Sequence, residues 1–553
     1  PQPLRNTPQP SRRTPQPLRN APQLQNQSNF KKISPLLLCF LISLSIYPAI
    51  PLSAQSRAKL FRTADIELYN NNFKKALQLY QRAYVMDTGN AQAAFKLGTC
   101  MYSIRKYKKP SLPYFEKAKR GGMAEGNYYL GNLYHLNGRF EDAMRAFQDY
   151  KNSSRKKNFQ DAEVDVLINK CTTAIELVKQ PVNVTIENIG SAINTEYPDY
   201  VPLISADESV LIFTSRRKGS TGNQLDPLGE YFEDVYISIR KDSRWTVPAT
   251  ISGNINSSSH DASVALSADG ELLFLYRTSK NVLSGDLYVS IFDGKDWTIP
   301  QKLPAPINSE NYTEPSASLL SEGQTLYFSS NRPGGYGKKD IYRVVKLGNG
   351  TWSKALNLGP SINTSEDEDA PFIHPDGKTL YFSSQGHKNM GGYDIFKTTL
   401  SKGYLLGKDG WSEPENIGYP VNTPDDDIYF VLSADGKRGY YSSDRPGGYG
   451  ATDIYLIHFS DNVVELSVYK AMVVAADSAE SPLRAKITLF DSATNKVEGI
   501  YNTNPLTGKF IMIIKPGREY TMQVESEGYV SCTNMINPSE EDVLGKIRLP
   551  KTE

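Results

Sequence analysis

Four acidic residues recur at one place in a repeated sequence pattern. They are Asp199, Asp261, Glu368 and Asp427, each six residues before the Ser or His that opens a repeat, and Glu314 lies near the equivalent place in a further copy. Carboxylates brought together in this way could form a ring that binds a cation or a basic peptide. Alternatively, each carboxylate caps a turn within its own repeat. The sequence leaves both interpretations open.

Sequence motifs of the common hydrolytic and phosphate-binding sites are absent. There is no Gly-x-Ser-x-Gly elbow, and the five histidines show neither His-x-x-x-His nor His-Glu-x-x-His spacing. Glycine-rich stretches such as Gly447–Gly450 lie between predicted strands and lack the Gly-Lys-Ser/Thr of a phosphate-binding loop. A glycosidase needs only two suitably spaced acids, so that reaction is conceivable. We nevertheless expect no enzymatic activity, no catalytic residue, no cofactor and no resident metal.

The composition indicates several domains and argues against nucleic-acid binding. The chain has 553 residues with 62 Lys+Arg and 60 Asp+Glu, but residues 1–54 hold six of the basic residues and no acidic one. The rest is therefore slightly acidic and lacks the basic face that phosphates require. The four cysteines are too few and too scattered for a disulfide scaffold.

The N-terminal residues are predicted to be a targeting segment and not part of a folded domain. Residues 1–30 form a Pro-, Gln- and Asn-rich tract, which we expect to be disordered. Residues 31–54 have two lysines, an apolar run and small residues at the end, a pattern typical of a signal peptide cleaved after Ala54. An uncleaved membrane anchor is the alternative. No function is assigned to this segment.

Residues 55–180 show a helical repeat. Two series of aromatic residues step by 34 and then 33 residues, namely Phe73, Tyr107, Phe140 and Tyr80, Tyr114, Phe147. All six are expected in the core. The period resembles that of tetratricopeptide repeats, which are pairs of helices. The middle repeat departs from the pattern because Pro110 occupies its small-residue position and residues 105–109 are strongly basic. The resemblance implies a concave partner-binding face, to which we assign Tyr102, Tyr128, Asn132 and His135.

Residues 182–460 are predicted to form a β-propeller. Five versions of a block Ser-Ala-Asp-Gly, Leu-Tyr-Phe-Ser-Ser, Asp-Ile-Tyr recur about every 53 to 59 residues, a spacing that suits four-stranded blades. Each of the four tryptophans stands 11 residues before the Asn of an Ile/Val-Asn pair. A fifth pair, Ile193-Asn194, precedes the first block. We therefore expect a strand near residue 183 to complete the last blade and close five blades into a ring. Six blades is the alternative.

The repeat resembles the PD40, or WD40-like, repeat of periplasmic propellers. The resemblance rests most clearly on Ser329–Gly337 and Ser442–Gly450, which share Arg-Pro-Gly-Gly-Tyr-Gly. Residues 463–553 alternate apolar and polar residues between Gly-centred turns and resemble a carboxypeptidase-regulatory-like β-sandwich. The predicted fold class is therefore multidomain: helical hairpins, a five-bladed propeller and a small sandwich.

The order of these modules resembles the PorE-like envelope proteins of the Bacteroidetes type IX secretion system. This resemblance implies a periplasmic scaffold, associated with the outer membrane, that links protein partners of the secretion complex. Such proteins commonly continue into an OmpA-like domain, so peptidoglycan is expected as a partner only if that domain follows. A cell-wall or glycan binding module, with a Tyr-rich propeller face stacked on sugars, is the alternative.

Overall fold

The structure is a computed structural model that describes residues 57–553, except 154–157, 227–228, 243, 280–283, 321–322, 401–409, 461–465, 539–544 and 553. The predicted disordered tract of residues 1–30 and the predicted signal peptide of residues 31–54 lie outside the described residues. Within the described part of the chain, no helix has the length and apolar character needed to span a bilayer.

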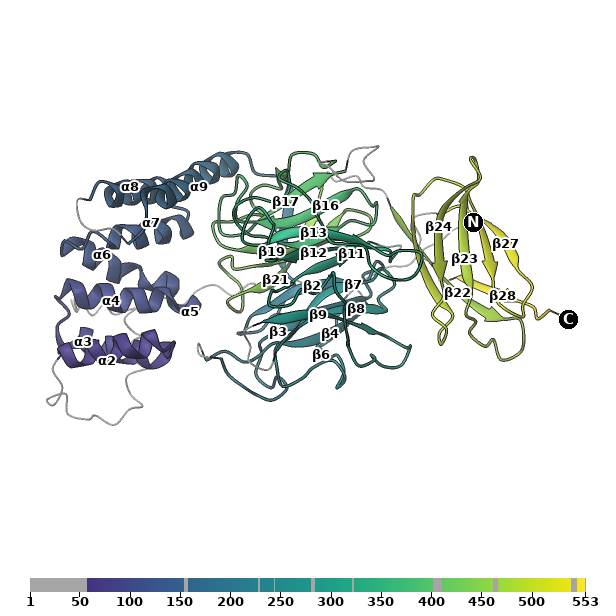
Figure 1. Cartoon of the computed structure of the whole chain (residues 1–553), viewed down its shortest axis with the longest axis horizontal. Coiled ribbons are helices and arrows are strands. Elements are labelled where there is room, and N and C mark those ends of the chain that lie inside the picture. The colour runs from purple at the N-terminus through teal and green to yellow at the C-terminus, as the bar shows by residue number, and fades with distance from the viewer. Residues whose placement is uncertain are drawn as a thin grey trace, which may run out of the picture. The chain divides into compact units, whose positions relative to one another are not determined.

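The first described part of the chain consists of helices packed in sequence order, as Figure 1 shows. The helices are α2 (Arg57–Tyr69), α3 (Phe73–Met86), α4 (Ala91–Tyr102), α5 (Arg105–Lys108), α6 (Leu112–Arg120), α7 (Gly126–Leu136), α8 (Phe140–Lys151) and α9 (Asp161–Lys179), with a 3₁₀ turn over Lys109–Ser111. Neighbours are antiparallel pairs because connections this short return the chain along the preceding helix.

Glycines in α4 and α7 allow aromatic rings to pack against the helix backbone. A Cβ on Gly131 would lie 2.4 Å from the Phe147 ring, and one on Gly98 would lie 3.2 Å from the ring of Phe115. The fully buried aromatic residue of the middle helical repeat is therefore Phe115. Tyr114 is only half-buried and Tyr107 is exposed. Tyr114 packs against the apolar cluster of the first helices. The prediction that Tyr107 belongs to the core is wrong, because the 3₁₀ turn at Pro110 shifts the start of α6.

The next part of the chain forms five antiparallel sheets, which build a β-propeller. The innermost strands are β2 (Asp199–Ile204), β7 (Asp261–Leu266), β11 (Ala317–Leu319), β15 (Glu368–Ile373) and β19 (Asp427–Leu432). The second strands are β3 (Val210–Ser215), β8 (Leu272–Thr278), β12 (Thr325–Ser330), β16 (Thr379–Ser384) and β20 (Arg438–Ser443). The third strands are β4 (Asp234–Lys241), β9 (Gly285–Ile291), β13 (Asp340–Val345), β17 (Asp394–Thr399) and β21 (Asp453–Phe459).

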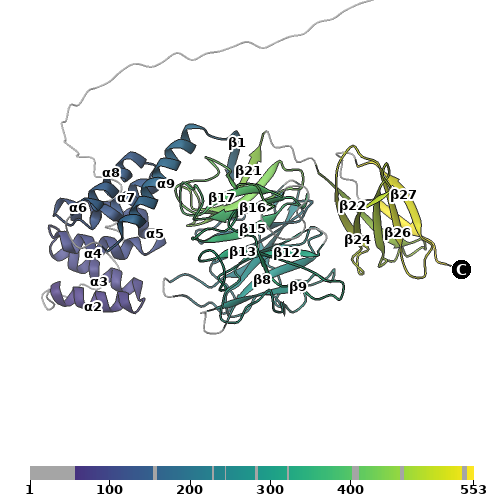
Figure 2. The ribbon, with the colours of Figure 1, turned by 45° about the horizontal axis from the view of Figure 1, so that its top comes forward.

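The outer strands are short except for one that comes from the beginning of the propeller sequence. The short ones are β5 (Arg244–Trp245), β6 (Ala249–Thr250), β10 (Gln301–Lys302), β14 (Leu356–Asn357) and β18 (Glu415–Asn416). In the last sheet this position is taken by β1 (Val184–Asn188), which pairs with β21 from Val184 opposite Phe459 to Asn188 opposite Tyr455. Figure 2 shows β1 beside β21. The predicted pairing of the early strand with the last sheet is confirmed.

The innermost strands follow one another around a common centre. Strand β2 contacts β7, β7 contacts β11, β11 contacts β15, β15 contacts β19, and β19 contacts β2. Between neighbouring sheets lie apolar clusters such as that around Leu326, Phe328 and Leu287. The sheets therefore hold their innermost strands around a central channel.

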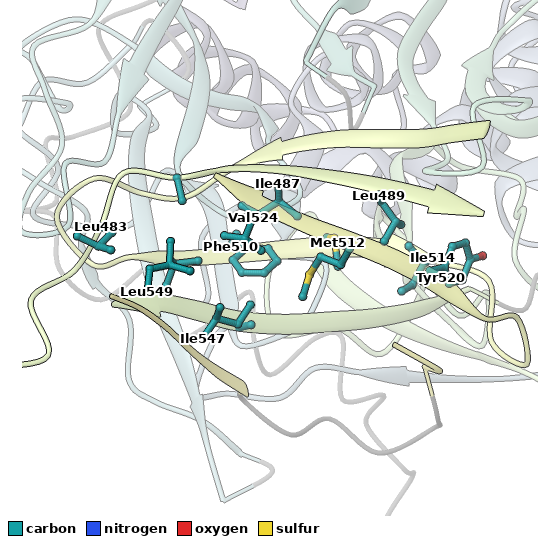
Figure 3. Packing of buried hydrophobic residues seen from close by; sticks show 14 of the residues in the cluster. Leu483, Ile487, Leu489, Phe510, Met512, Ile514, Tyr520, Val524, Ile547 and Leu549 are labelled. Atoms are coloured by element: carbon teal, nitrogen blue, oxygen red, sulfur yellow. The ribbon is translucent and has the colours of Figure 1, made fainter. Parts of the chain in front are cut away.

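The C-terminal part of the described chain consists of two sheets that share one core. One sheet has the order β25–β22–β28 and the other β24–β23–β26–β27. The strands are β22 (Ser467–Ala475), β23 (Lys486–Asp491), β24 (Lys496–Asn502), β25 (Lys509–Ile514), β26 (Tyr520–Glu525), β27 (Cys532–Ile536) and β28 (Gly545–Leu549). Figure 3 shows side chains from both sheets, among them Ile487, Phe510, Met512 and Ile547, meeting between them. Two sheets packed in this way make a small β-sandwich.

Candidate functional site

The repeated acidic residues lie at the start of the innermost strands, but they are fully buried in turns of their own sheets. Asp199 accepts hydrogen bonds from the Thr195 amide (2.6 Å) and hydroxyl (2.7 Å). The same arrangement recurs for Asp261 with Ser257, for Glu368 with Thr364 and for Asp427 with Thr423. The hypothesis of a carboxylate ring in the channel is therefore wrong, because each carboxylate is used to cap a turn.

Four of the five acids in this repeated position also pair with an arginine of their own sheet. The pairs are Arg217 with Asp199, Arg277 with Asp261, Arg332 with Glu314, and Arg445 with Asp427. Each arginine also donates to a backbone carbonyl, that of the Ile or Val in an Ile/Val-Asn pair of the repeat. Arg217, for example, donates to the Ile193 carbonyl (2.8 Å). These ion pairs therefore join the turn, the acid and the second strand within each sheet.

Glu368 lacks such an arginine. Gly386 stands where three other sheets have Arg217, Arg332 and Arg445. His387 Nε2 contacts the Ile362 carbonyl instead (2.8 Å). Burial raises the pKa of Glu368 to about 7, although hydrogen bonds from Thr364 and Ser384 act in the opposite direction. Across the described residues, no three His, Cys, Asp or Glu side chains come together in a group that could hold a metal ion.

The four residues predicted on the helical binding face lie in different environments. Tyr102, the last residue of α4, meets the Tyr129 ring edge-on at 5.1 Å between centroids. In α7, the Tyr128 ring stacks on Phe159 at 3.6 Å, and the Asn132 amide donates to the Tyr128 carbonyl (2.9 Å). These three side chains are half-buried, so part of each remains accessible.

His135 is buried and cannot form part of an accessible face. Its Nε2 lies 2.6 Å from the carbonyl oxygen of Met390, in the loop before β17, and its Nδ1 lies 3.2 Å from the Sγ of Cys171. Since a carbonyl can only accept, Nε2 carries the proton and the thiol donates to Nδ1. Burial lowers the pKa of His135 to about 4. The expectation that His135 projects toward a partner is wrong, because its ring is used within the chain.

A polar cavity of about 130 Å³ lies in the channel, near the start of the innermost strands. Its wall contains one carboxylate, Glu233, together with Tyr200, Tyr276 and Tyr429. Further along the channel, a second cavity of about 90 Å³ is lined mainly by apolar side chains of the strand ends, and Ile513 of β25 also lines it. The polar side chains are thus gathered at one end of the channel.

Glu233 is held by hydrogen bonds on both oxygens. The Tyr200 hydroxyl donates to Oε1, and His260 Nδ1 lies 2.8 Å from Oε2. Burial disfavours the charged form, but the hydrogen bonds from His260 and Tyr200 and the charge of Arg216 outweigh it and lower the pKa of Glu233. Arg216 in turn pairs with Asp226 and Glu230, both at 2.6 Å. The carboxylate is therefore ionised and fixed in orientation at neutral pH.

A second charged group adjoins the cavity wall through Ser316. The Ser316 hydroxyl, which lines the cavity, donates to Asp369, and Asp369 pairs with Lys339. The Lys339 ammonium also donates to the Tyr393 hydroxyl (3.0 Å). Burial lowers the pKa of Lys339, but the nearby Asp369 carboxylate and Tyr393 outweigh it, so the net pKa is raised. Both charges of this pair are matched within the protein.

Tyr276 reaches the cavity because two positions of its sheet depart from the repeat. Tyr276 stands where the other sheets have Ser or Thr, and Gly285 stands where they have a larger residue. A Cβ on Gly285 would lie 2.4 Å from Cζ of Tyr276. The glycine therefore provides the space that the tyrosine ring occupies.

The hydroxyls of Tyr276 and Tyr429 form no hydrogen bond with any described residue. Burial raises the pKa of Tyr276 to about 12 and also raises that of Tyr429. Both phenols consequently remain protonated at neutral pH and can donate as well as accept. They are the unpaired polar groups that this cavity presents.

Left-handed backbone is found at one position of three innermost strands. Val201, Ala370 and Tyr429 have φ of 52°, 49° and 60°, and the strand register shifts at each of them. Such values are unfavourable for residues with a Cβ, particularly a β-branched one, and they cluster at binding sites. The bulges turn residues of these strands toward the channel.

The channel residues could not be recognised from the recurring positions, because they lie where the copies of the repeat differ. The residue after each repeated acid differs between copies and includes Tyr200 and Asp369; the residue before the third strand also differs and includes Glu233 and Lys339. Variation at these positions within an otherwise regular repeat is the sequence feature that points to the channel residues. A comparison of the copies for positions that differ would have found them.

No family model and no curated protein sequence matches the chain. Solved structures that resemble it are propellers. An α-L-arabinofuranosidase from Lactobacillus brevis is 15% identical, with 51% of this chain and 93% of that chain covered and a TM-score of 0.33. An endo-arabinase from Bacteroides thetaiotaomicron is 16% identical, with 50% and 97% covered and a TM-score of 0.34. The propeller domain of the Trilobed protease from Pyrococcus furiosus is 12% identical, with 62% and 95% covered and a TM-score of 0.24.

These comparisons correct one expectation from the sequence. The arabinofuranosidase and the endo-arabinase are enzymes, which contradicts the expectation that the chain is not one. At these identities and TM-scores, the likeness concerns the propeller fold and transfers no reaction or substrate to this chain.

Proposed function

We propose that the chain is a periplasmic adaptor of the bacterial envelope, associated with the outer membrane, that serves type IX secretion. The order of helices, propeller and small sandwich supports this proposal, together with the signal-peptide pattern of residues 31–54. In this proposal the helix pairs are tetratricopeptide repeats that bind protein partners, and the last two sheets are a carboxypeptidase-regulatory-like module.

The five sheets are, in this proposal, the five blades of one closed ring. The contacts of β19 with β2 and the pairing of β1 with β21 support closure, since they join the first and last sheets. A sixth blade would need a further sheet between residues 455 and 470. The described residues of that stretch belong to the end of β21 and the beginning of β22.

The single observation that carries a binding role for the propeller is the polar cavity in its channel. Glu233 is ionised and fixed there, while two tyrosine hydroxyls have no partner among the described residues. A site with a fixed acceptor and unpaired hydroxyls is suited to hold a ligand. This observation also favours the second candidate function, a cell-wall or glycan binding module.

Deletion of the gene in its native bacterium tests the proposal. We expect proteins that carry the type IX sorting domain to accumulate within the envelope, as measured by mass spectrometry of secreted and envelope fractions. Expression of the full chain should restore secretion. Normal secretion with altered wall composition or glycan uptake would contradict the adaptor role and favour the second candidate.

A further inference from the structure

We propose that the channel cavity binds one neutral sugar ring, with the Tyr276 and Tyr429 hydroxyls and the Glu233 carboxylate as its hydrogen-bonding groups. This inference rests on the proposed role of the channel as a ligand site. It adds the chemical class of the ligand and its place within the channel.

The size of the cavity suits one ring. Its volume is about 130 Å³, and since a cavity of about 150 Å³ holds benzene, this volume limits the enclosed part of a ligand to a single ring. The rings of Tyr200 and Tyr429 lie 6.4 Å apart between centroids, inclined by 31°, so both can contact the apolar side of a sugar. The apolar side chains further along the channel offer no hydrogen bonds to a longer polar ligand.

The charges around the cavity favour an uncharged ligand. Lys339 is matched by Asp369, and Arg216 is matched by Asp226 and Glu230. Glu233 already accepts from Tyr200 and His260. An anion would face the Glu233 carboxylate, the charged side chain of the described cavity wall, and would find Lys339 and Arg216 already paired. It would therefore lose hydration without gaining a partner of opposite charge. A cation would gain only a carboxylate that hydrogen bonds from Tyr200 and His260 already stabilise.

The unpaired groups of the cavity match the hydroxyls of a sugar. Each hydroxyl of a sugar donates one hydrogen bond and accepts others, as the Tyr276 and Tyr429 phenols do. A carboxylate such as Glu233 has lone pairs left after two hydrogen bonds, so it can accept from a ligand hydroxyl. A sugar would thus satisfy polar groups that the described residues leave unpaired.

The inference is tested by measuring how neutral, cationic and anionic sugars bind to the full chain. The neutral arm contains glucose, galactose, mannose, arabinose and N-acetylglucosamine; the cationic arm is glucosamine and the anionic arm is glucuronate. Saturation-transfer NMR detects binding and isothermal titration calorimetry gives the affinity. We expect at least one neutral sugar to bind at least tenfold more tightly than glucosamine and glucuronate.

Variants locate the binding. We expect Tyr276→Phe and Tyr429→Phe each to weaken binding of the neutral sugar about three- to tenfold, the usual worth of one hydrogen bond, and Glu233→Gln to weaken it as well. Tyr336→Phe is the matched control, because Tyr336 is 53% exposed and lies outside the cavity wall. Melting curves show which variants remain folded, and the two Phe variants provide independent tests.

The outcomes separate the two proposals. Tighter binding of glucosamine or glucuronate that Tyr276→Phe weakens would overturn the neutral-sugar inference and retain the channel as a ligand site. Neutral-sugar binding that both Phe variants leave unchanged would overturn the inference by placing the sugar elsewhere. Absence of binding in every arm would overturn it too, whereas the adaptor role is decided by the secretion phenotype of the deletion strain.

Discussion

The side-chain amide of Asn194 is bonded to the backbone of Ile454, 260 residues further along the chain. Its Nδ2 donates to the Ile454 carbonyl (2.8 Å) and its Oδ1 accepts from the Ile454 amide (2.9 Å). Asn256, Asn308, Asn363 and Asn422 make the same pair of bonds, but within about 21 to 27 residues. Four of these asparagines thus bond a nearby part of the chain, whereas Asn194 uses the same pair of bonds to join the two ends of the propeller sequence.

Replacing Asn194 tests this junction. We expect Asn194→Ala to lower the free energy of unfolding by about 1–3 kcal/mol. It leaves the buried Ile454 amide without a partner, whereas the Ile454 carbonyl still accepts from the Ile189 amide. Asn308→Ala is the matched control, since Asn308 bonds Leu287 in the same way within one sheet. Differential scanning calorimetry measures both. A wild-type melting temperature for Asn194→Ala alone would show that β1 does not hold the last sheet in solution.

Glu368 should make the stability of the chain depend on pH. Its folded-state pKa of about 7 lies above its ordinary value of 4.5, so folding favours the protonated form. The contribution is therefore lost as the pH rises from about 4.5 to about 7. Glu368→Gln remains neutral, and we expect its melting temperature to fall less between pH 5 and pH 7.5 than that of the wild type. Glu498→Gln, exposed in β24, is the control; equal falls in all three proteins would contradict the assignment.

The sequence predicted the architecture of the propeller because its framework residues recur. The Asn of each Ile/Val-Asn pair bonds the third strand, and each repeated acid caps a turn, so their spacing follows the spacing of the sheets. The unpaired early motif Ile193-Asn194 even predicted the pairing of β1 with β21. Recurrence is also why the acids were misjudged as a candidate binding site: a residue needed in every sheet is needed for the sheet.

The residues of the candidate site could not be predicted from recurrence, because they lie at positions where the copies of the repeat differ. Glu233 and Lys339 occupy equivalent positions in different sheets, each directly before the third strand. That these two opposite charges lie near the same channel follows only from the arrangement of the sheets around one centre. The same limit applies to the basic residues 105–109, whose partners lie more than 300 residues away in the sequence. Partners this distant are set by tertiary packing.

The basic residues 105–109 should couple energetically to two acidic residues of the propeller, Asp425 before β19 and Asp444 after β20. Arg105 pairs with Asp444, which is 7% exposed, and Lys109 lies 3.1 Å from Asp425. Burial raises the pKa of Asp444 to about 7, although the charge of Arg105 acts against this. We expect Arg105→Met to lower the melting temperature and Asp444→Asn to recover part of the loss, with a coupling of about 0.5–3 kcal/mol.

A double-mutant cycle on the two single variants and the double variant measures this coupling. Lys119→Met is the control, because Lys119 pairs with Asp149 within the helical part of the chain and should add independently to Asp444→Asn. Additivity of Arg105→Met and Asp444→Asn would contradict the ion pair. Coupling that weakens with added salt would support it, since salt screens partly exposed charges.

Gly285 and Tyr276 should behave as one unit, because the missing side chain of the first makes room for the ring of the second. We expect Gly285→Ala to destabilise the chain by about 1–3 kcal/mol through overpacking, since its Cβ would lie 2.4 Å from the tyrosine ring. Adding Tyr276→Ser, the residue type of the other sheets at this position, should restore most of the stability. Gly253→Ala is the matched control: nothing lies within 4 Å of its Cβ, and its effect should stay within about 0.5 kcal/mol. If Gly285→Ala melts as the wild type does, the space beside Gly285 does not confine the Tyr276 ring, and the two residues do not act as one unit.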